Sequence, residues 1–301
     1  MSSSTCISRA LGLRTEHPPI GVRVLLASRT DMRQPSADLE RLVGREGEMR
    51  DLRAAFRKGC SQLIWGAADS GKTFLIAKIL ADLTQNERRK CICWSGPASR
   101  RQLVEQLIRA LYGAGDPLVR KKVHADGYGD STLVRWVGAQ SLLRLRGILF
   151  TAAEQGDYRF FLDHLSPISH AFAHLLKEIM YRTKTPVYLT GRGYTQGEIG
   201  FAWSLYWTDE YRVHLGSISD AAARELMEIC IEKFRLGSLD LGGFRDELLH
   251  LSGHLPGSIV KMCQLAADPR YHYGEQVKLK LLHVDYLLQG NRFSSSPGFL
   301  S

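Results

Sequence analysis

The chain has 301 residues, of which 44% are hydrophobic and 24% are charged, and it carries a formal net charge of +9. This composition is typical of a globular protein with a buried core and excludes fibrous and low-complexity classes. Because Arg or Lys interrupts each long apolar run well before the roughly 20 residues that a membrane span needs, we expect no membrane span and a cytoplasmic location.

The N-terminal segment, residues 1–40, is rich in Ser and Arg. It lacks the continuous apolar stretch of a secretory signal. We expect it to be a flexible extension that precedes the folded region, and a transit peptide, which is similarly rich in Ser and Arg, is the alternative.

The first clear structural pattern is an apolar strand at 61–66, followed by a short polar loop and an amphipathic helix at 71–85. The loop, GAADSGKT, matches G-x-x-x-x-G-K-[ST] at Gly66, Gly71, Lys72 and Thr73. In such a loop the backbone N–H groups surround phosphate oxygens, the Lys reaches the β- and γ-phosphates and the Thr hydroxyl binds Mg²⁺. The start of the following helix adds partial positive charge.

This motif predicts an ATP site whose phosphate contacts come from one continuous segment. Its residues are Gly66, Ala67, Ala68, Asp69, Ser70, Gly71, Lys72, Thr73 and Phe74. Within this set we expect Lys72 to act on the phosphates during catalysis.

Strands and helices continue to alternate after this point. We predict strands at 90–96, 157–166 and 186–193, helices at 99–113, 133–156 and 167–185, and a glycine-rich loop at 114–132. Strands separated by helices form a parallel sheet with helices on both faces, and such sheets bind ligands at the carboxyl ends of their strands. We therefore predict an α/β P-loop domain, a parallel sheet flanked by helices, over residues 41–210.

A P-loop needs an acidic residue at the end of a neighbouring strand, because Mg²⁺ prefers carboxylate oxygens. Asp163, at the end of FFLD, is the candidate, and with Thr73 it would form the metal site. The alternative is that Asp163 only caps a helix or turn. The next residue is His164, where many ATPases place a second acid that polarises water. An imidazole can act as a base, but we expect slow hydrolysis.

The strand PVYLT ends in Thr190, Gly191 and Arg192. Thr190 could orient water near the γ-phosphate. Arg192 could sense that phosphate or serve a neighbouring subunit, and the alternative is a simple ion pair with a surface acid.

The pattern becomes wholly helical after the last predicted strand. We predict helices at 219–237, 244–253, 255–269 and 275–290, which form a small all-helical domain over residues 211–290. The last residues, 291–301, are expected to be disordered.

Charge and cysteine usage bear on the partners and the compartment. Residues 41–150 contain 20 Lys and Arg against 10 Asp and Glu, whereas residues 151–301 contain 15 against 17. Basic clusters at 87–90, 99–102 and 119–122 could bind nucleic acid or an acidic partner, and solvated loops explain them equally well. The six cysteines match no disulfide or zinc spacing, which favours reduced thiols in the interior.

Several segments together resemble the AAA+ and STAND group of P-loop ATPases. They are LVGREGEMRDL (42–52), the phosphate loop, FFLD, LTGR, VHLGSISDAAARELM (213–227) and LSGHLPGSIVKM (251–262). The resemblance is greatest to the branch with origin-recognition-type initiators, transposition helpers and ExeA-like ATPases. It implies an AAA+-like sheet followed by a helical lid, with Val43, Gly44 and Arg45 beside the adenine and Pro256 in the lid motif near the nucleotide.

The chain departs from that pattern in three places. His164 replaces the usual second acid. Gly257 stands after Pro256, where a basic residue is often found, and Lys261 is a weak substitute for it. The chain also leaves no room for a winged-helix domain after the lid, which disfavours a full initiator.

Two functions of different classes follow from these residues. The first is an ATP-binding molecular switch with slow, Mg²⁺-dependent hydrolysis, which assembles with copies of itself or engages a partner, with DNA as one candidate. The alternative is a nucleotide-stabilised protein-interaction module with little or no hydrolysis. The complete phosphate loop favours the first, and His164 favours the second. A small-molecule kinase is disfavoured because no Arg-rich mobile lid is evident.

Overall fold

A computed structural model describes residues 42–96, 99–165 and 168–292 of the chain. The predicted flexible extension at 1–40, and most of the predicted disordered tail at 291–301, lie outside these residues. Among the described residues no helix is long and apolar enough to cross a membrane.

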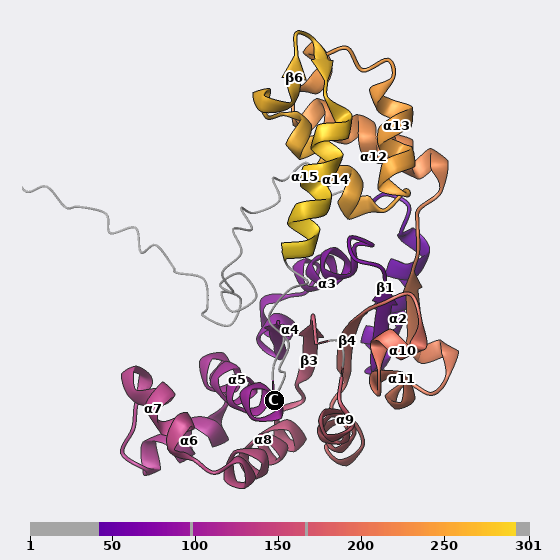
Figure 1. Cartoon of the computed structure of the whole chain (residues 1–301). Coiled ribbons are helices and arrows are strands. Elements are labelled where there is room, and N and C mark those ends of the chain that lie inside the picture. The colour runs from indigo at the N-terminus through magenta and orange to yellow at the C-terminus, as the bar shows by residue number, and fades with distance from the viewer. Residues whose placement is uncertain (1–41, 97–98, 166–167, 293–301) are drawn as a thin grey trace, which may run out of the picture.

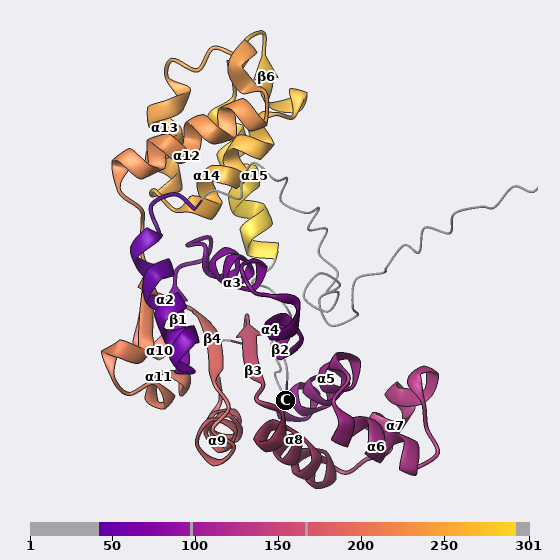
Figure 2. The same cartoon turned by 180° about the vertical axis from the view of Figure 1, so that it is seen from behind.

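The centre of the molecule is a five-stranded parallel sheet in the order β2-β3-β4-β1-β5 (Figures 1 and 2). The strands are β1 (Gln62–Gly66), β2 (Cys91–Ser95), β3 (Arg159–Asp163), β4 (Val187–Arg192) and β5 (Arg212–Leu215). This arrangement confirms the predicted α/β class. Strand β5 pairs with β1, so the sheet continues past residue 210, where the sequence pattern places the domain boundary.

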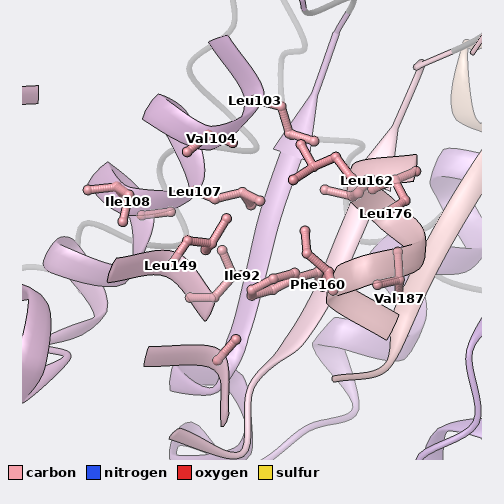
Figure 3. Close-up of a cluster of buried hydrophobic side chains, with 14 of the residues drawn as sticks. Ile92, Leu103, Val104, Leu107, Ile108, Leu149, Phe160, Leu162, Leu176 and Val187 are labelled. Carbon is pink, nitrogen blue, oxygen red and sulfur yellow. The ribbon is translucent and has the colours of Figure 1, made fainter. Parts of the chain in front are cut away.

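Helices cover both faces of the sheet because its strands are apolar on both sides. On β3, Phe160 and Leu162 pack in one cluster and Phe161 packs in the other. The first face carries α5 (Arg100–Ala114), α8 (Leu142–Gly156) and α9 (His170–Lys177), and Figure 3 shows part of this core. The second face carries α2 (Glu46–Lys58) and α3 (Lys72–Ala81).

The described residues between β2 and β3 form the α-helices α5 to α8, and this region differs from the predicted pattern in two places. The segment 114–132 was expected to be a loop but contains helix α6 (Pro117–Ala125). Asp116 caps this helix by accepting the Val119 N–H at 2.7 Å, and both Val119 and Val123 are buried. Tertiary burial therefore outweighs the glycine-rich composition.

The predicted helix at 133–156 is two helices, α7 (Leu133–Ala139) and α8. Between them Gln140 is extended, and Ser141 caps α8 with its side chain. Short helices complete the domain: α4 (Gln85–Arg89), α10 (Gln196–Ile199), α11 (Ala202–Leu205) and the π-helical turn Glu178–Arg182 that continues α9.

The C-terminal domain consists of α12 (Asp220–Lys233), α13 (Phe244–Ser252), α14 (Pro256–Ala266) and α15 (Leu279–Arg292) around a core of its own. It is not wholly helical. Residues 276–277 were expected in a helix but form β7 (Gln276–Val277), which pairs with β6 (His272–Tyr273) in a hairpin. Gly274, with φ of +59°, makes the tight turn between them.

This domain lies over the carboxyl end of the sheet, next to α3 (Figures 1 and 2). In both views the last helix, α15, runs toward α3, the helix that follows the phosphate loop. We call this domain the lid because of that position.

Candidate functional site

The GAADSGKT loop connects β1 to α3, which is the strand–loop–helix context that the motif requires. Gly66 has φ of +153° and Gly71 has φ of +96°. A Cβ added to Gly66 would lie 2.2 Å from the carbonyl oxygen of Leu215 on the neighbouring strand. The first glycine of the motif is therefore required both by its backbone conformation and by the close approach of β5.

Lys72 is the buried cation of this loop, with 5% of its surface exposed. Its ammonium donates to the carbonyl oxygens of Gly66 at 2.9 Å and Ala67 at 2.5 Å, and it lies 3.2 Å from the Ser70 hydroxyl. These partners are neutral. Burial lowers the pKa of Lys72 to about 8, an effect that nearby Asp163 opposes and Arg192 reinforces. A buried ammonium with neutral partners is well suited to bind an anion such as a phosphate group.

This lowered pKa predicts a pH dependence of ATP binding. In the free protein Lys72 loses its proton as the pH rises through about 8. Triphosphate binding favours the charged form, so the bound complex holds that proton to higher pH, and affinity should fall by up to about tenfold per unit above pH 8. Calorimetry at pH 8.5 in two buffers of different ionisation enthalpy should show proton uptake on binding. No uptake at pH 8.5, or equal uptake at pH 6.5, would contradict this assignment.

Asp163 is buried at the end of β3, with 2% of its surface exposed, and two threonines hold its carboxylate. The Thr73 hydroxyl donates to Oδ2 at 2.8 Å, and the Thr190 hydroxyl donates to Oδ1. Thr190 also accepts the backbone N–H of His164 at 3.0 Å. Thr190 therefore positions Asp163 in this structure.

These groups fit a magnesium ion. The Thr73 hydroxyl and the Asp163 carboxylate supply hard oxygen atoms beside the phosphate loop, and Mg²⁺ commonly takes such ligands together with phosphate oxygens and water. When bound, the ion would neutralise developing charge on the phosphates. Within the described part of the chain, no three His, Cys, Asp or Glu side chains gather as a metal site, so Thr73 and the nucleotide are needed to complete this one.

The fold places His164 beside Thr73 and Asp163. Its backbone is left-handed, with φ of +60°, and 52% of its side chain is exposed. Its Nε2 lies 3.4 Å from the Thr73 hydroxyl and 3.3 Å from Oδ2 of Asp163.

Arg192 ends β4, where it lies opposite Gly66 in the register of β1 and β4. Its side chain is exposed, and its charge contributes to the lowered pKa of Lys72. The structure thus brings Arg192 to the phosphate end of the site, and its predicted sensor role stays a prediction.

The entry segment joins the lid to the phosphate loop. Val43 packs in the lid core, and Gly44, with φ of +67°, lies against Ala222 of α12, where an added Cβ would approach to 2.7 Å. Arg45 is buried and donates to the carbonyl oxygen of Ser70 at 3.3 Å and to that of Gly216. One guanidinium therefore bridges the phosphate loop and the linker into the lid.

Asp69, in the middle of the phosphate loop, is the main contact with the lid. Its backbone carbonyl accepts the N–H of Gly257 at 2.8 Å. Its carboxylate pairs with Lys261 at 2.7 Å and accepts the hydroxyl of Tyr286 at 3.0 Å. Both the backbone and the side chain of Asp69 are thus bound by residues of α14 and α15.

This contact explains why glycine follows Pro256. A Cβ on Gly257 would lie 2.8 Å from the backbone oxygen of Asp69 and 2.9 Å from its Cα, so a basic side chain does not fit there without displacing the lid. Lys261, one turn further along α14, is a basic residue that pairs with Asp69 of the loop.

The other predicted residues lie on the phosphate-loop segment or, for Pro256, at the start of α14. Ala67 is buried, Ala68 and Phe74 are half-buried, and Pro256 is the first residue of α14. Sequence reasoning missed Tyr286, which contacts Asp69, and Ser258, whose hydroxyl lies 2.7 Å from that of Tyr286. Neither residue was assigned a role from the sequence. Tyr286 has the spacing of an apolar residue in a helix, and nothing in the sequence indicates that its hydroxyl contacts the loop.

Two solved structures are similar to the chain over most of its length. The Walker-type ATPase PABY2304 of Pyrococcus abyssi matches with a TM-score of 0.52 and 16% identity, over 84% of this chain and 75% of that one. The Orc1 protein of Aeropyrum pernix, in complex with DNA, matches with a TM-score of 0.52 and 15% identity, over 84% of this chain and 68% of that one. No protein-family model and no curated protein matches the chain. At these identities the likeness concerns the fold alone, which this chain shares with those two proteins over most of its length.

Proposed function

We propose that the protein is an ATP-binding molecular switch in which nucleotide in the phosphate loop sets the position of the lid, and that it hydrolyses ATP slowly with Mg²⁺. The observation that carries this proposal is the contact of Asp69 with Gly257, Lys261 and Tyr286. Because Asp69 lies inside the phosphate-binding segment, a ligand that reshapes the loop acts directly on the lid.

The strength of these contacts suits a switch. The Lys261 side chain is 57% exposed, so its ion pair contributes at most about 1 kcal/mol, and the two hydrogen bonds to Asp69 bring the sum to roughly 2 to 5 kcal/mol. A micromolar ligand releases about 8 kcal/mol on binding. Differential ATP binding to two lid positions is therefore large enough to change their populations.

The alternative, a nucleotide-stabilised interaction module without useful hydrolysis, draws its support from His164. This residue stands where a second acid would polarise water, and its imidazole lies against Thr73 and Asp163 rather than apart from them. In this alternative, ATP would stabilise the contact between Asp69 and the lid, and a partner protein would bind the arrangement that this contact maintains.

The surface favours a protein partner over DNA. In the basic clusters, Arg88 donates to three backbone carbonyls and Arg101 to Glu105 and two carbonyls, so both stabilise the fold. Lys121 and Lys122 are exposed on α6. Helix α15, which contacts Asp69, exposes Leu281, Val284, Leu287 and Leu288 by 47 to 53%. An apolar face on the nucleotide-linked helix is suited to a second protein chain.

ATP turnover, measured with and without double-stranded DNA, tests this proposal. We expect slow Mg²⁺-dependent turnover that Asp163→Asn lowers about tenfold or more, because it weakens the metal site. Turnover of Asp163→Asn equal to that of the native protein at every Mg²⁺ concentration would reduce Asp163 to a capping residue. Tight binding without turnover under any condition would favour the alternative, and DNA stimulation would restore DNA as the partner.

A further inference from the structure

We propose that Nε2 of His164 is a third protein ligand of the divalent cation held by Thr73 and Asp163, and that this nitrogen shifts the metal preference of the site from Mg²⁺ toward Co²⁺. The inference rests on the nucleotide site proposed above. It concerns which ion serves that site, and it gives a role to the residue that departs most from the expected motif.

The first support is the arrangement of three donor atoms. Oγ1 of Thr73 lies 2.8 Å from Oδ2 of Asp163, and Nε2 of His164 lies 3.4 Å from the first atom and 3.3 Å from the second. Adjacent ligands of an octahedral ion with bonds of about 2.1 Å are about 3.0 Å apart. The three atoms are therefore within about 0.4 Å of the mutual spacing of one face of such a site.

The second support is that Nε2 of His164 lies between two oxygen atoms and makes only long contacts with them. Both distances from Nε2 exceed the range of about 2.7 to 3.2 Å for a good nitrogen–oxygen hydrogen bond. The nitrogen thus lies near two oxygen atoms without a short bond to either. A shared cation would satisfy all three atoms.

The third support is the backbone. His164 adopts φ of +60°, a conformation that a residue with a side chain seldom takes, and Thr190 holds it there by accepting its N–H. This conformation occurs together with the return of the ring toward Thr73, immediately after the metal-binding aspartate. Unusual backbone conformations of this kind cluster at functional sites.

The chemical consequence is a change in metal preference. Carboxylate, hydroxyl and water suit Mg²⁺, whereas an imidazole nitrogen binds later first-row ions such as Co²⁺ more strongly. A site with Asp163 and an acidic neighbour would have oxygen donors throughout. As a ligand, His164 would add one neutral nitrogen donor to the oxygen donors of Thr73 and Asp163.

Metal titrations of the full chain, saturated with the β,γ-methylene analogue of ATP, test the proposal. Calorimetry gives the ratio of Co²⁺ to Mg²⁺ affinity for the native protein, His164→Ala and His164→Asp, with His174→Ala as the matched control because that ring is 64% exposed and pairs with Glu178. Removing one ligand should lower the Co²⁺ to Mg²⁺ ratio about tenfold or more. His164→Asp should lower the ratio further by strengthening Mg²⁺ binding, and His174→Ala should leave it unchanged.

A spectroscopic readout identifies the ligand directly. Pulsed electron paramagnetic resonance of Mn²⁺ in the same complex should show a nitrogen coupling that changes when the protein carries ¹⁵N-histidine and disappears in His164→Ala. An unchanged affinity ratio in His164→Ala, or a Mn²⁺ signal insensitive to the label, overturns the inference while the ATP site stands. Absence of nucleotide binding with any metal overturns the proposed function as well.

Discussion

Lys72→Ala should abolish tight ATP binding, with a loss of affinity of about 100-fold or more. The ammonium of Lys72 is buried against the carbonyl oxygens of Gly66 and Ala67, so its charge is held inside the loop that we propose to bind the phosphates. A charge-assisted hydrogen bond contributes about 1.5 to 3 kcal/mol, and a low-dielectric site adds Coulomb attraction to a multiply charged phosphate. Calorimetry of ATP binding measures the loss.

A folding control makes this result interpretable. Burial of the ammonium lowers the pKa of Lys72, which means that its charge costs folding free energy at pH 7. Its removal offsets part of the lost hydrogen bonding, so the melting temperature of the ligand-free variant should lie within about 5 °C of the native value. Native ATP affinity in a folded Lys72→Ala protein would refute the phosphate-loop assignment.

Gly257→Ala should separate the lid from the phosphate loop. The added methyl group would meet the backbone oxygen and Cα of Asp69 at 2.8 and 2.9 Å, and backbone atoms cannot move aside as a flexible side chain can. The lid must shift, which weakens the Gly257 hydrogen bond and the Lys261 ion pair together. We expect a loss of about 1 to 3 kcal/mol in the free energy of unfolding and a change in ATP affinity. Thermal unfolding and calorimetry measure the two effects.

The matched control is Gly237→Ala in the same domain, where no atom lies within 4 Å of the added carbon. This variant should keep native stability and ATP affinity. Equal behaviour of the two variants would mean that the contact at Asp69 does not link the lid to the nucleotide site.

The phosphate loop could be read from sequence because it is local. Gly66 to Thr73 are consecutive, so their spacing alone fixes how backbone N–H groups surround an anion. The alternation of apolar strands and helices likewise predicted the parallel sheet, because a strand buried on both faces is apolar throughout. Helix α6 was not predicted because it is stabilised by the burial of its two valines under other helices, and this burial depends on the tertiary structure.

The contacts between distant segments could not be read in this way. Asp69 meets Lys261 and Tyr286, which are separated from it by 192 and 217 positions along the chain. In the sequence, position 257 departs from a pattern that often has a basic residue there. The fold places this position where a side chain does not fit. His164 was identified by its position after Asp163, while its left-handed backbone and its distance from Thr73 depend on Thr190 on another strand.

The sequence by itself therefore determined the phosphate-loop motif, the sheet class and the presence of a second helical domain, since each follows from residues close together in the chain. The tertiary structure decided how these parts are connected: which residue of the loop the lid contacts, why a side chain does not fit at 257, and that His164 lies beside Thr73 and Asp163. Those features depend on the packing of separate segments, and packing is set by shape and burial across the whole fold rather than by any local pattern.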